Sequence, residues 1–278
     1  MKDYIKLFDT PQDGNNYKIK DIPFFCYVNE TGQDLVCNQE HKYLYNINNE
    51  LVIDFPPTPN INFVDLGLSV KWSQYNEGVN STQLENVEDW YGNYYAWGEI
   101  VSKSDYSWWT YKYANFDYNK LIKYCPTDKT DYWDGIGQPD NKLFLDIEDD
   151  LFKRKYYEDW ENKYRIPTKE EIQELLNLPN KWVTDFKGIS GLNGRIFAKT
   201  QVELDGTFND DTMLFIPAAG GFGGSTSFDA GSGCCLWSSS LNSGGPSGAW
   251  ALYFYSGNIG LNDSSRYYGF SVRCVSTD

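Results

Sequence analysis

The C-terminal stretch from Leu236 to Val275 has two well-defined ends and a loose, polar middle. The ends are the segments Leu236 to Ser240 and Gly269 to Val275. Between them, from Asn242 to Tyr268, the chain is almost wholly Gly, Ser, Asn, Asp, Tyr, Ala and Leu, and it lacks Lys, Glu, Gln and Met. Tyr, Ser, Gly and Asn are the residues that antibody-type binding loops favour. The contrast predicts a rigid scaffold that presents a variable surface.

Three apolar residues interrupt the polar middle at every second position. They are Trp250, Leu252 and Phe254, and this spacing is typical of a half-buried β-strand. The residues that alternate with them, Ala251 and Tyr253 among them, should therefore face away from the core. We expect the first row to belong to the scaffold, together with Trp237, Phe270 and Val272, and the second row to belong to the presented surface.

The polar middle also obeys a limit set by the genetic code. An Asn codon ending in a pyrimidine, altered at either adenine, reaches Ser, Gly, Asp, Tyr, Ala, Leu, Pro and others, but it never reaches Lys, Glu, Gln, Met or Trp. Apart from the scaffold residue Trp250, the middle segment contains none of the unreachable residues. It thereby resembles the variable proteins of diversity-generating retroelements, whose C-terminal region is rewritten by adenine-directed mutagenesis. The resemblance implies a C-type-lectin-like fold that displays its variable residues as a ligand-binding surface.

On this reading the variable region spans about 236–275, and its ligand-binding positions should form one contiguous exposed patch. An ordinary Gly/Ser/Asn-rich loop over a strand is the alternative that needs no retroelement. The candidate ligand-binding positions are Gly244, Gly245, Ser247, Gly248, Ala251, Tyr253, Tyr255, Gly257, Asn258, Gly260, Leu261, Asn262, Asp263, Ser264, Ser265 and Tyr268.

Earlier segments extend the resemblance over most of the chain. Phe63 to Trp72 predicts a strand, a turn and a second strand, and Asp89 to Glu99 sets several aromatic residues among glycines. Both segments resemble the repeated surface-protein domain of Bacteroidetes and Fibrobacter, which belongs to the same lectin-like and sulfatase-modifying-factor superfamily. Thr168 and Glu171 have the spacing of a capping box, which predicts a helix that ends before Pro179.

These patterns predict an α+β fold. We expect a C-type-lectin-like (sulfatase-modifying-factor-like) domain over 61–278, in which 199–275 is all strand and turn. It follows a small β-rich N-terminal segment with a proline-rich linker, 1–60. Within that segment, Tyr4 to Thr10 resembles the start of structural proteins from phages of gut Bacteroidetes. The segment either docks onto the main domain or helps it oligomerise, a homotrimer being one such form.

Charge and hydropathy restrict the partners. The formal charge of −15 disfavours nucleic acid and anionic membranes, which leaves a protein or carbohydrate receptor on a cell surface. The alternative is that the acidity serves solubility alone. No apolar run is long enough to span a membrane, and the first residues lack a signal-peptide core. We therefore expect a chain made in the cytoplasm and associated with a virion, as part of a phage tail, or else cytoplasmic. A bacterial adhesin or lectin with an invariant site is the second hypothesis.

An enzyme of the formylglycine-generating class is the third hypothesis, but the residues favour neither catalysis nor a cofactor. The formylglycine-generating branch of the superfamily uses a cysteine pair, but Cys234 and Cys235 have no nearby His, so buried free thiols are expected. The single histidine, His41, precedes the linker. The acid pairs at 149–150 and 210–211 are expected to be solvated turns, the alternative being the carboxylate pair of a glycosidase. Calcium binding stays open, because no Asp/Asn-rich turn has the EF-hand order.

Overall fold

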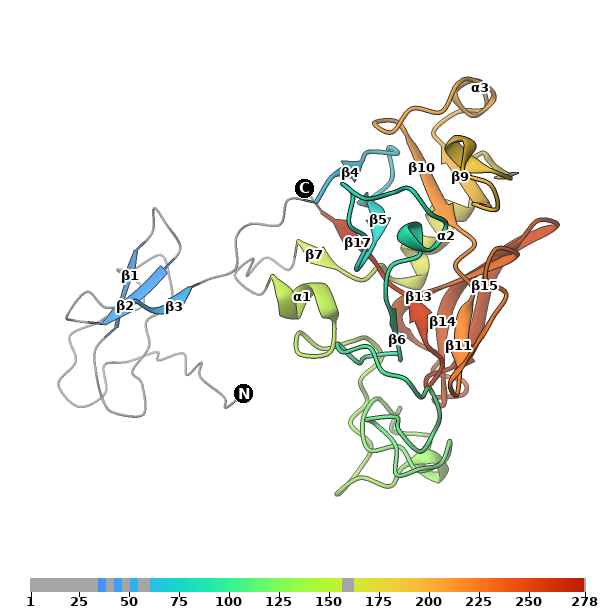
Figure 1. Cartoon of the computed structure of the whole chain (residues 1–278). Coiled ribbons are helices and arrows are strands. Elements are labelled where there is room, and N and C mark those ends of the chain that lie inside the picture. Colours follow the sequence, from blue (N-terminus) through green and yellow to red (C-terminus); the bar gives the residue numbers. More distant parts are fainter. Residues whose placement is uncertain (1–34, 39–42, 47–50, 55–60, 157–162, 278) are drawn as a thin grey trace. The chain divides into compact units, whose positions relative to one another are not determined.

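The computed structural model describes residues 35–38, 43–46, 51–54, 61–156 and 163–277 (Figure 1). The chain divides into two compact units, Met1–Pro59 and Asn60–Asp278. In the first unit, three strands form an antiparallel sheet: β1 (Leu35–Asn38), β2 (Tyr43–Asn46) and β3 (Leu51–Asp54). The phage-like segment from Tyr4 to Thr10 and the proline-rich linker at 55–60 lie outside the described residues.

The second unit mixes helices and strands, and strands predominate. Its largest sheet has the order β15-β14-β13-β16-β6, and a four-stranded sheet has the order β4-β5-β17-β7. Two smaller sheets have the orders β10-β9-β8 and β11-β12. The strands are β4 (Phe63–Val64), β5 (Lys71–Asn76), β6 (Tyr94–Tyr95), β7 (Tyr164–Arg165), β8 (Asn180–Val183), β9 (Gly194–Ala198), β10 (Met213–Pro217), β11 (Gly221–Gly223), β12 (Thr226–Phe228), β13 (Gly233–Leu241), β14 (Gly248–Tyr255), β15 (Asn258–Ser265), β16 (Phe270–Ser271) and β17 (Arg273–Ser276).

Three short α-helices are described, α1 (Leu151–Lys155), α2 (Lys169–Leu176) and α3 (Gln201–Asp205), with 3-10 turns at Glu88–Trp90, Thr130–Tyr132 and Phe186–Gly188. The capping box of α2 is confirmed, since Thr168 accepts from the Glu171 backbone and Glu171 accepts from the backbone of Thr168. The expectation of strand and turn throughout 199–275 was wrong. Thr200 and Glu203 form a second capping box, which starts α3.

The largest sheet has a hydrophobic core on each face. In β13, Cys234 and Leu236 belong to one core, while Cys235 and Trp237 belong to the other. Because successive residues of a strand point to opposite faces, every residue of β13 is buried. The core that contains Leu236 is shared with α2, whereas the core that contains Trp237 is shared with residues between 95 and 152. Packed side chains therefore cover both faces of the largest sheet.

The strands near the two ends of the second unit pair with each other. β17 runs antiparallel to β5 and to β7, and β5 also pairs with β4 (Figure 1). The strand-turn-strand expected from Phe63 to Trp72 is confirmed by this β4–β5 pair. The sheet brings Arg273 to Val275, the last residues of the C-terminal stretch, next to the first strands of the unit. The C-terminal stretch is thus anchored in a second sheet as well as in the largest one.

Candidate ligand-binding surface

Strands β14 and β15 form an antiparallel hairpin at the edge of the largest sheet. Leu252 and Phe254 are completely buried in the core shared with α2, as the alternation predicted. Trp250 precedes them on the same face and is only half-buried, with the ammonium group of Lys169 5.6 Å from its ring centroid. The inner row of β14 therefore belongs to the scaffold, and Trp250 lies at its margin.

The opposite face of β14 is only partly free. Tyr255 is 41% exposed and Tyr253 is half-buried, and their ring centroids are 6.0 Å apart. Ala251, expected on the exposed face, is 1% exposed. It is the register partner of Trp237 in β13, and both side chains belong to the core shared with 95–152. The expectation for Ala251 was wrong because that core covers the outer face of the strand at this point.

The register of β15 assigns each candidate to a face. Gly260, Asn258 and Asn262 pair with Tyr253, Tyr255 and Ala251 and therefore share their face. Leu261 pairs with Leu252 and packs against the core shared with α2. Asp263 and Ser265, the register partners of Trp250 and Gly248, also face that side of the sheet. The expectation of one contiguous exposed patch was therefore wrong, because strand alternation divides the candidates between the two faces of the sheet.

Exposure separates the sixteen candidates into three groups. Gly248 and Ala251 are buried. The half-buried candidates are Gly245, Ser247, Tyr253, Gly260, Leu261, Ser264, Ser265 and Tyr268. The exposed ones are Gly244, Tyr255, Gly257, Asn258, Asn262 and Asp263. We call Tyr253, Tyr255, Asn258, Gly260, Asn262 and Ser264, which the register places on one side, the hairpin face.

The loop that precedes β14 is fixed by its own hydrogen bonds. Asn242 accepts from the backbone N–H of Gly244 at 3.0 Å and donates to the carboxylate of Asp263 at 3.0 Å. The backbone N–H of Arg266 donates to the carbonyl oxygen of Ser247 at 3.0 Å. Candidates in this loop are thereby tied to β15, so the small residues at 244–248 present a defined backbone shape.

Arg266 is a scaffold residue inside the polar middle, and sequence reasoning did not single it out. It is completely buried. Its Nη1 donates to the carbonyl oxygens of Tyr124 at 2.9 Å and Pro246 at 3.0 Å, and its Nε donates to the hydroxyl of Tyr111 at 2.9 Å. The guanidinium also lies 5.3 Å from the ring centroid of Trp97. Arg266 thus joins the loop before β14 to the part of the chain around 111–124.

Partly exposed aromatic side chains flank the last candidate, Tyr268. Its ring lies 4.4 Å from that of Tyr267 and 5.8 Å from that of Phe228, and Tyr267 lies 5.1 Å from Trp108. Burial, together with a hydrogen bond to Tyr268, raises the pKa of Tyr267 to about 12. Three of these residues were not among the candidates. Trp108 and Phe228 come from distant segments, so only the fold reveals them.

The thiols have the environment expected for inert cysteines. Cys125, Cys234, Cys235 and Cys274 are free and buried. Burial raises the pKa of Cys235 to about 12 and that of Cys125 to about 11, and it raises the pKa values of the other two well above their ordinary value. His41 lies outside the described residues. The described thiols are therefore unsuited to act as thiolate nucleophiles.

The acid pair at 149–150 is not a solvated turn. Asp149 and Asp150 are 2% and 0% exposed. Asp149 accepts from the hydroxyls of Tyr113 and Tyr124 and from Lys123. Burial opposes ionisation of Asp149, but these contacts outweigh it and lower its pKa. Asp150 caps α1 instead. The expectation failed because the turn is covered by aromatic side chains from 111–124, and the two carboxylates serve the fold.

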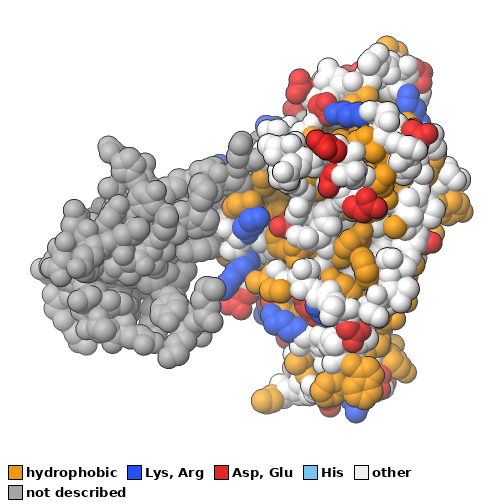
Figure 2. Space-filling view, in the orientation of Figure 1, with side chains coloured by type: hydrophobic (Ala, Val, Ile, Leu, Met, Phe, Trp, Pro, Cys, Tyr) orange, Lys and Arg blue, Asp and Glu red, His pale blue; other side chains and the backbone are white. Residues whose placement is uncertain are grey.

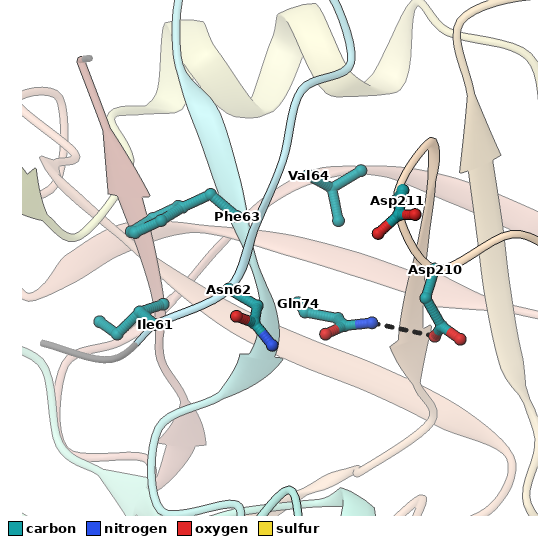
Figure 3. A pocket seen from close by; sticks show the side chains of 7 residues that line it. All are labelled: Ile61, Asn62, Phe63, Val64, Gln74, Asp210 and Asp211. Carbon is teal, nitrogen blue, oxygen red and sulfur yellow. Dashed lines mark hydrogen bonds between the residues drawn. The ribbon is translucent and has the colours of Figure 1, made fainter.

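The acid pair at 210–211 borders a polar hollow of about 310 Å³ between β4, β5 and the turn before β10 (Figure 3). Asp210 accepts from the Gln74 amide at 2.9 Å and from Lys187 at 2.8 Å. Asn62 also lines this hollow, which shares no residue with the hairpin. Among the described residues, no group of three or more His, Cys, Asp and Glu side chains is placed to hold a metal ion.

Two further findings bear on the class of protein. Within the described part of the chain, no helix combines the length and the apolar character needed to cross a membrane. Comparisons of the chain with protein-family models, curated proteins and solved structures found no match. Any statement about function therefore rests on the sequence patterns and on the geometry of the hairpin.

Proposed function

We propose that the chain is a ligand-binding protein whose recognition surface is the hairpin face and the loops at the ends of β14 and β15. The observation that carries this proposal is the division of β14. On one face, Leu252 and Phe254 are fully buried. On the opposite face, Tyr253 and Tyr255 lie at the C-terminal end of the strand and are partly exposed to solvent. Tyrosines held on a rigid strand offer apolar area and a hydroxyl group at low entropic cost.

In the finer form of the proposal, the chain is a variable protein of a diversity-generating retroelement with a C-type-lectin-like fold. The six exposed candidates are Gly, Tyr, Asn and Asp, all within reach of adenine-directed changes to Asn codons. Their side chains add little to either core, so they can be replaced without loss of the scaffold. The stretch covered by the resemblance, 63–275, begins in β4 and ends in β17, and both strands belong to one sheet.

We assign the binding to a receptor on a cell surface, recognised by a phage or prophage particle. The charge of −15 favours a protein or carbohydrate partner over nucleic acid. A non-diversified adhesin would use the same hairpin. The genes that flank the coding sequence distinguish the diversified protein from the adhesin. A diversified protein requires an adjacent reverse transcriptase and an adenine-bearing copy of the segment that encodes 242–268.

We propose no catalytic role. The burial and raised pKa of Cys234 and Cys235 support this, since a formylglycine-generating enzyme needs a reactive thiol. Asp149 and Asp150 are committed to hydrogen bonds within the fold, which argues against a glycosidase pair.

The experiment that tests the proposal measures attachment of the fluorescently labelled full chain to a panel of gut Bacteroidetes strains by flow cytometry. The variant combines Tyr253→Ser, Tyr255→Ser and Asn258→Ser on the hairpin face. The matched control is Val202→Ser, which removes an apolar side chain that is 83% exposed on α3. We expect the triple variant to lose or change the strains it binds, while the control keeps them and both retain the thermal midpoint. Unchanged attachment of the triple variant to every strain contradicts the proposal.

A further inference from the structure

β15 is the outermost strand of the largest sheet, beside β14 (Figure 1). It has eight residues, whereas no other edge strand among the described sheets has more than five. It pairs with β14 along its whole length without a register shift, and it contains neither Pro nor Lys. Bulges, prolines and lysines are devices by which proteins commonly block an exposed edge. The largest sheet therefore ends in a long, regular strand that lacks these devices.

The turn between β14 and β15 determines which backbone groups of β15 point outward. Because Tyr255 and Asn258 close a two-residue turn, they exchange both hydrogen bonds, and every second residue of β15 then bonds to β14. The intervening residues Ile259, Leu261 and Asp263 direct their N–H and C=O groups away from the sheet. No described residue donates to or accepts from these outward groups. Backbone donors and acceptors at strand spacing are therefore free along this edge.

The opposite edge of the same sheet is engaged by side chains. Its last strand is β6, whose two residues are Tyr94 and Tyr95. The carbonyl oxygen of Tyr94 accepts from the hydroxyl of Tyr106 at 2.6 Å, and that of Tyr95 accepts from the indole N–H of Trp237 at 2.9 Å. The open edge of the sheet is therefore β15, where a further strand can be added.

The groups along the open edge select the chemistry of an occupant. Free N–H and C=O groups at every second residue match the backbone of an extended polypeptide. Ile259 and Leu261 pack against the core shared with α2 but are only half-buried, so an added strand can cover them with an apolar side chain. On the other face of β15, Asn258 and Asn262 are exposed. The matching occupant is an extended segment in which apolar and polar side chains alternate.

The charge of the edge favours a basic segment. Asp263 is the one charged residue of β15 and is exposed. Its carboxylate accepts from the Asn242 amide at 3.0 Å and forms no ion pair with a described residue. Acidic side chains are spread over the visible face of the second unit (Figure 2), so the charge of −15 attracts a basic segment without choosing its place. The open edge supplies the place, and a second copy of this chain would bring the same negative charge to it.

We propose that β15 binds an extended, basic segment of the receptor protein, which joins the largest sheet as a further strand. Addition of a strand to an open edge is an established mode of peptide recognition. This inference rests on the proposed function, because β15 supplies Asn258, Gly260, Asn262 and Ser264 to the hairpin face, and it narrows the receptor to a protein. Backbone bonds at the edge are independent of side-chain identity, so they persist when the hairpin face is diversified.

The first test exposes the full chain to a displayed library of random peptides and then synthesises the selected sequences. We expect them to contain Lys or Arg among alternating apolar residues. A bound peptide should slow amide hydrogen exchange at Ile259, Leu261 and Asp263 by about tenfold or more. Gly260 and Asn262 are the internal control, since their N–H groups already bond to β14. Failure to select a peptide, or protection of other amides in place of these three, overturns the proposal.

Variants at Asp263 separate the backbone bond from the charge. Asp263→Pro removes one outward N–H and should weaken binding of the selected peptide by about tenfold or more. Asp263→Asn keeps that N–H and an oxygen for Asn242, so it should weaken binding by about fivefold or less at low salt and have no effect in about 0.5 M NaCl. A peptide methylated on its alternate backbone nitrogens alters no protein residue and should lose binding in one of the two alternate sets. Equal binding by a folded Asp263→Pro chain and by both methylated peptides contradicts strand addition.

Attachment to cells distinguishes failure of this inference from failure of the proposed function. Digestion of surface proteins on a strain that binds the chain should abolish attachment. Attachment that survives digestion assigns the receptor to carbohydrate and overturns the inference, while the hairpin face stays in place as the binding surface. Attachment that ignores the triple variant of the hairpin face contradicts the proposed function instead. A dimer in sedimentation equilibrium that protects Ile259, Leu261 and Asp263 would give the edge to a second copy, which also overturns the inference.

Discussion

Arg266 donates from Nη1 to the carbonyl oxygen of Pro246 at 3.0 Å, across twenty residues of the polar middle. The guanidinium has no carboxylate within ion-pair distance among the described residues. Carbonyl oxygens, a tyrosine hydroxyl and aromatic faces surround it instead. Its burial is offset by these charge-assisted hydrogen bonds. One buried cation thus fixes both ends of the β14–β15 hairpin to the segment around 111–124.

We predict that Arg266→Met lowers the free energy of unfolding by about 3 to 5 kcal/mol, because the carbonyl oxygens of Tyr124, Pro246 and Lys123 lose their donor. Denaturant titration measures this loss. Lys169→Met is the matched control, since Lys169 lies at the surface over Trp250, and it should cost less than about 1 kcal/mol. An equally small loss in Arg266→Met would show that the buried network does not hold the hairpin.

The two faces of β14 should differ in stability. Leu252→Ala and Phe254→Ala each remove a fully buried side chain and should cost about 2 to 5 kcal/mol. Tyr255→Ala, at an exposed position, should stay within about 1 kcal/mol of the unaltered chain. Tyr253→Ala should do the same. Thermal or denaturant melts compare the four variants, and equal losses at all of them would contradict the assignment of faces.

Local patterns in the sequence were sufficient to predict several elements. The alternation of Trp250, Leu252 and Phe254 specified the scaffold row, and the capping box at Thr168 specified the start of α2. Both signals depend on residues a few positions apart. The second capping box, at Thr200, carried the same signal and was overlooked.

The remaining features depend on contacts between distant segments. Ala251 is buried because residues between 95 and 152 pack over its face of the strand, and no sequence pattern near 251 predicts that contact. Asp149 is buried for the same reason, through Tyr113 and Tyr124. Arg266 differs from a surface arginine only by its partners at 111, 123, 124 and 246. Which residues of the hairpin are buried and which are exposed therefore could not be predicted from the hairpin sequence alone.

The described thiols should react slowly. In a chain carrying Cys26→Ser and Cys37→Ser, only the four buried cysteines remain. Burial raises all four pKa values, to about 11 for Cys125 and about 12 for Cys235, so the thiolate fraction at neutral pH is very small. Alkylation of the native protein by iodoacetamide should be at least about a hundredfold slower than that of free cysteine. A thiol that reacts faster than free cysteine would revive the enzymatic hypothesis.

Asp150 should make stability depend on pH. Its carboxylate accepts from the backbone N–H groups of Phe152, Lys153 and Ile166, yet burial raises its pKa to about 6. Because the folded pKa exceeds the ordinary value of 3.8, the stabilising contribution is complete below that value and is lost as pH rises through about 6.

The measurement compares the free energy of unfolding of the unaltered chain with that of Asp150→Asn, which keeps a capping oxygen but does not titrate. Between about pH 4 and pH 7, the advantage of the unaltered chain should fall by up to about 3 kcal/mol. The lowered pKa of Asp149 acts in the opposite direction, but it is common to both chains and cancels in the difference. A difference that stays constant across this range would contradict the raised pKa of Asp150.

The last prediction uses the register pair Ala251 and Asn262, which face the same side of the hairpin. Ala251 is enclosed at 1% exposure, whereas Asn262 is exposed. Ala251→Tyr should therefore cost about 1 to 3 kcal/mol or more through overpacking against Trp237, and Asn262→Tyr should stay within about 0.5 kcal/mol. Denaturant titration of both variants gives the comparison. If diversity is written into this hairpin, it can enlarge position 262 freely while position 251 must stay small. Equal tolerance of tyrosine at both positions would contradict the enclosure of Ala251 and return it to the binding surface.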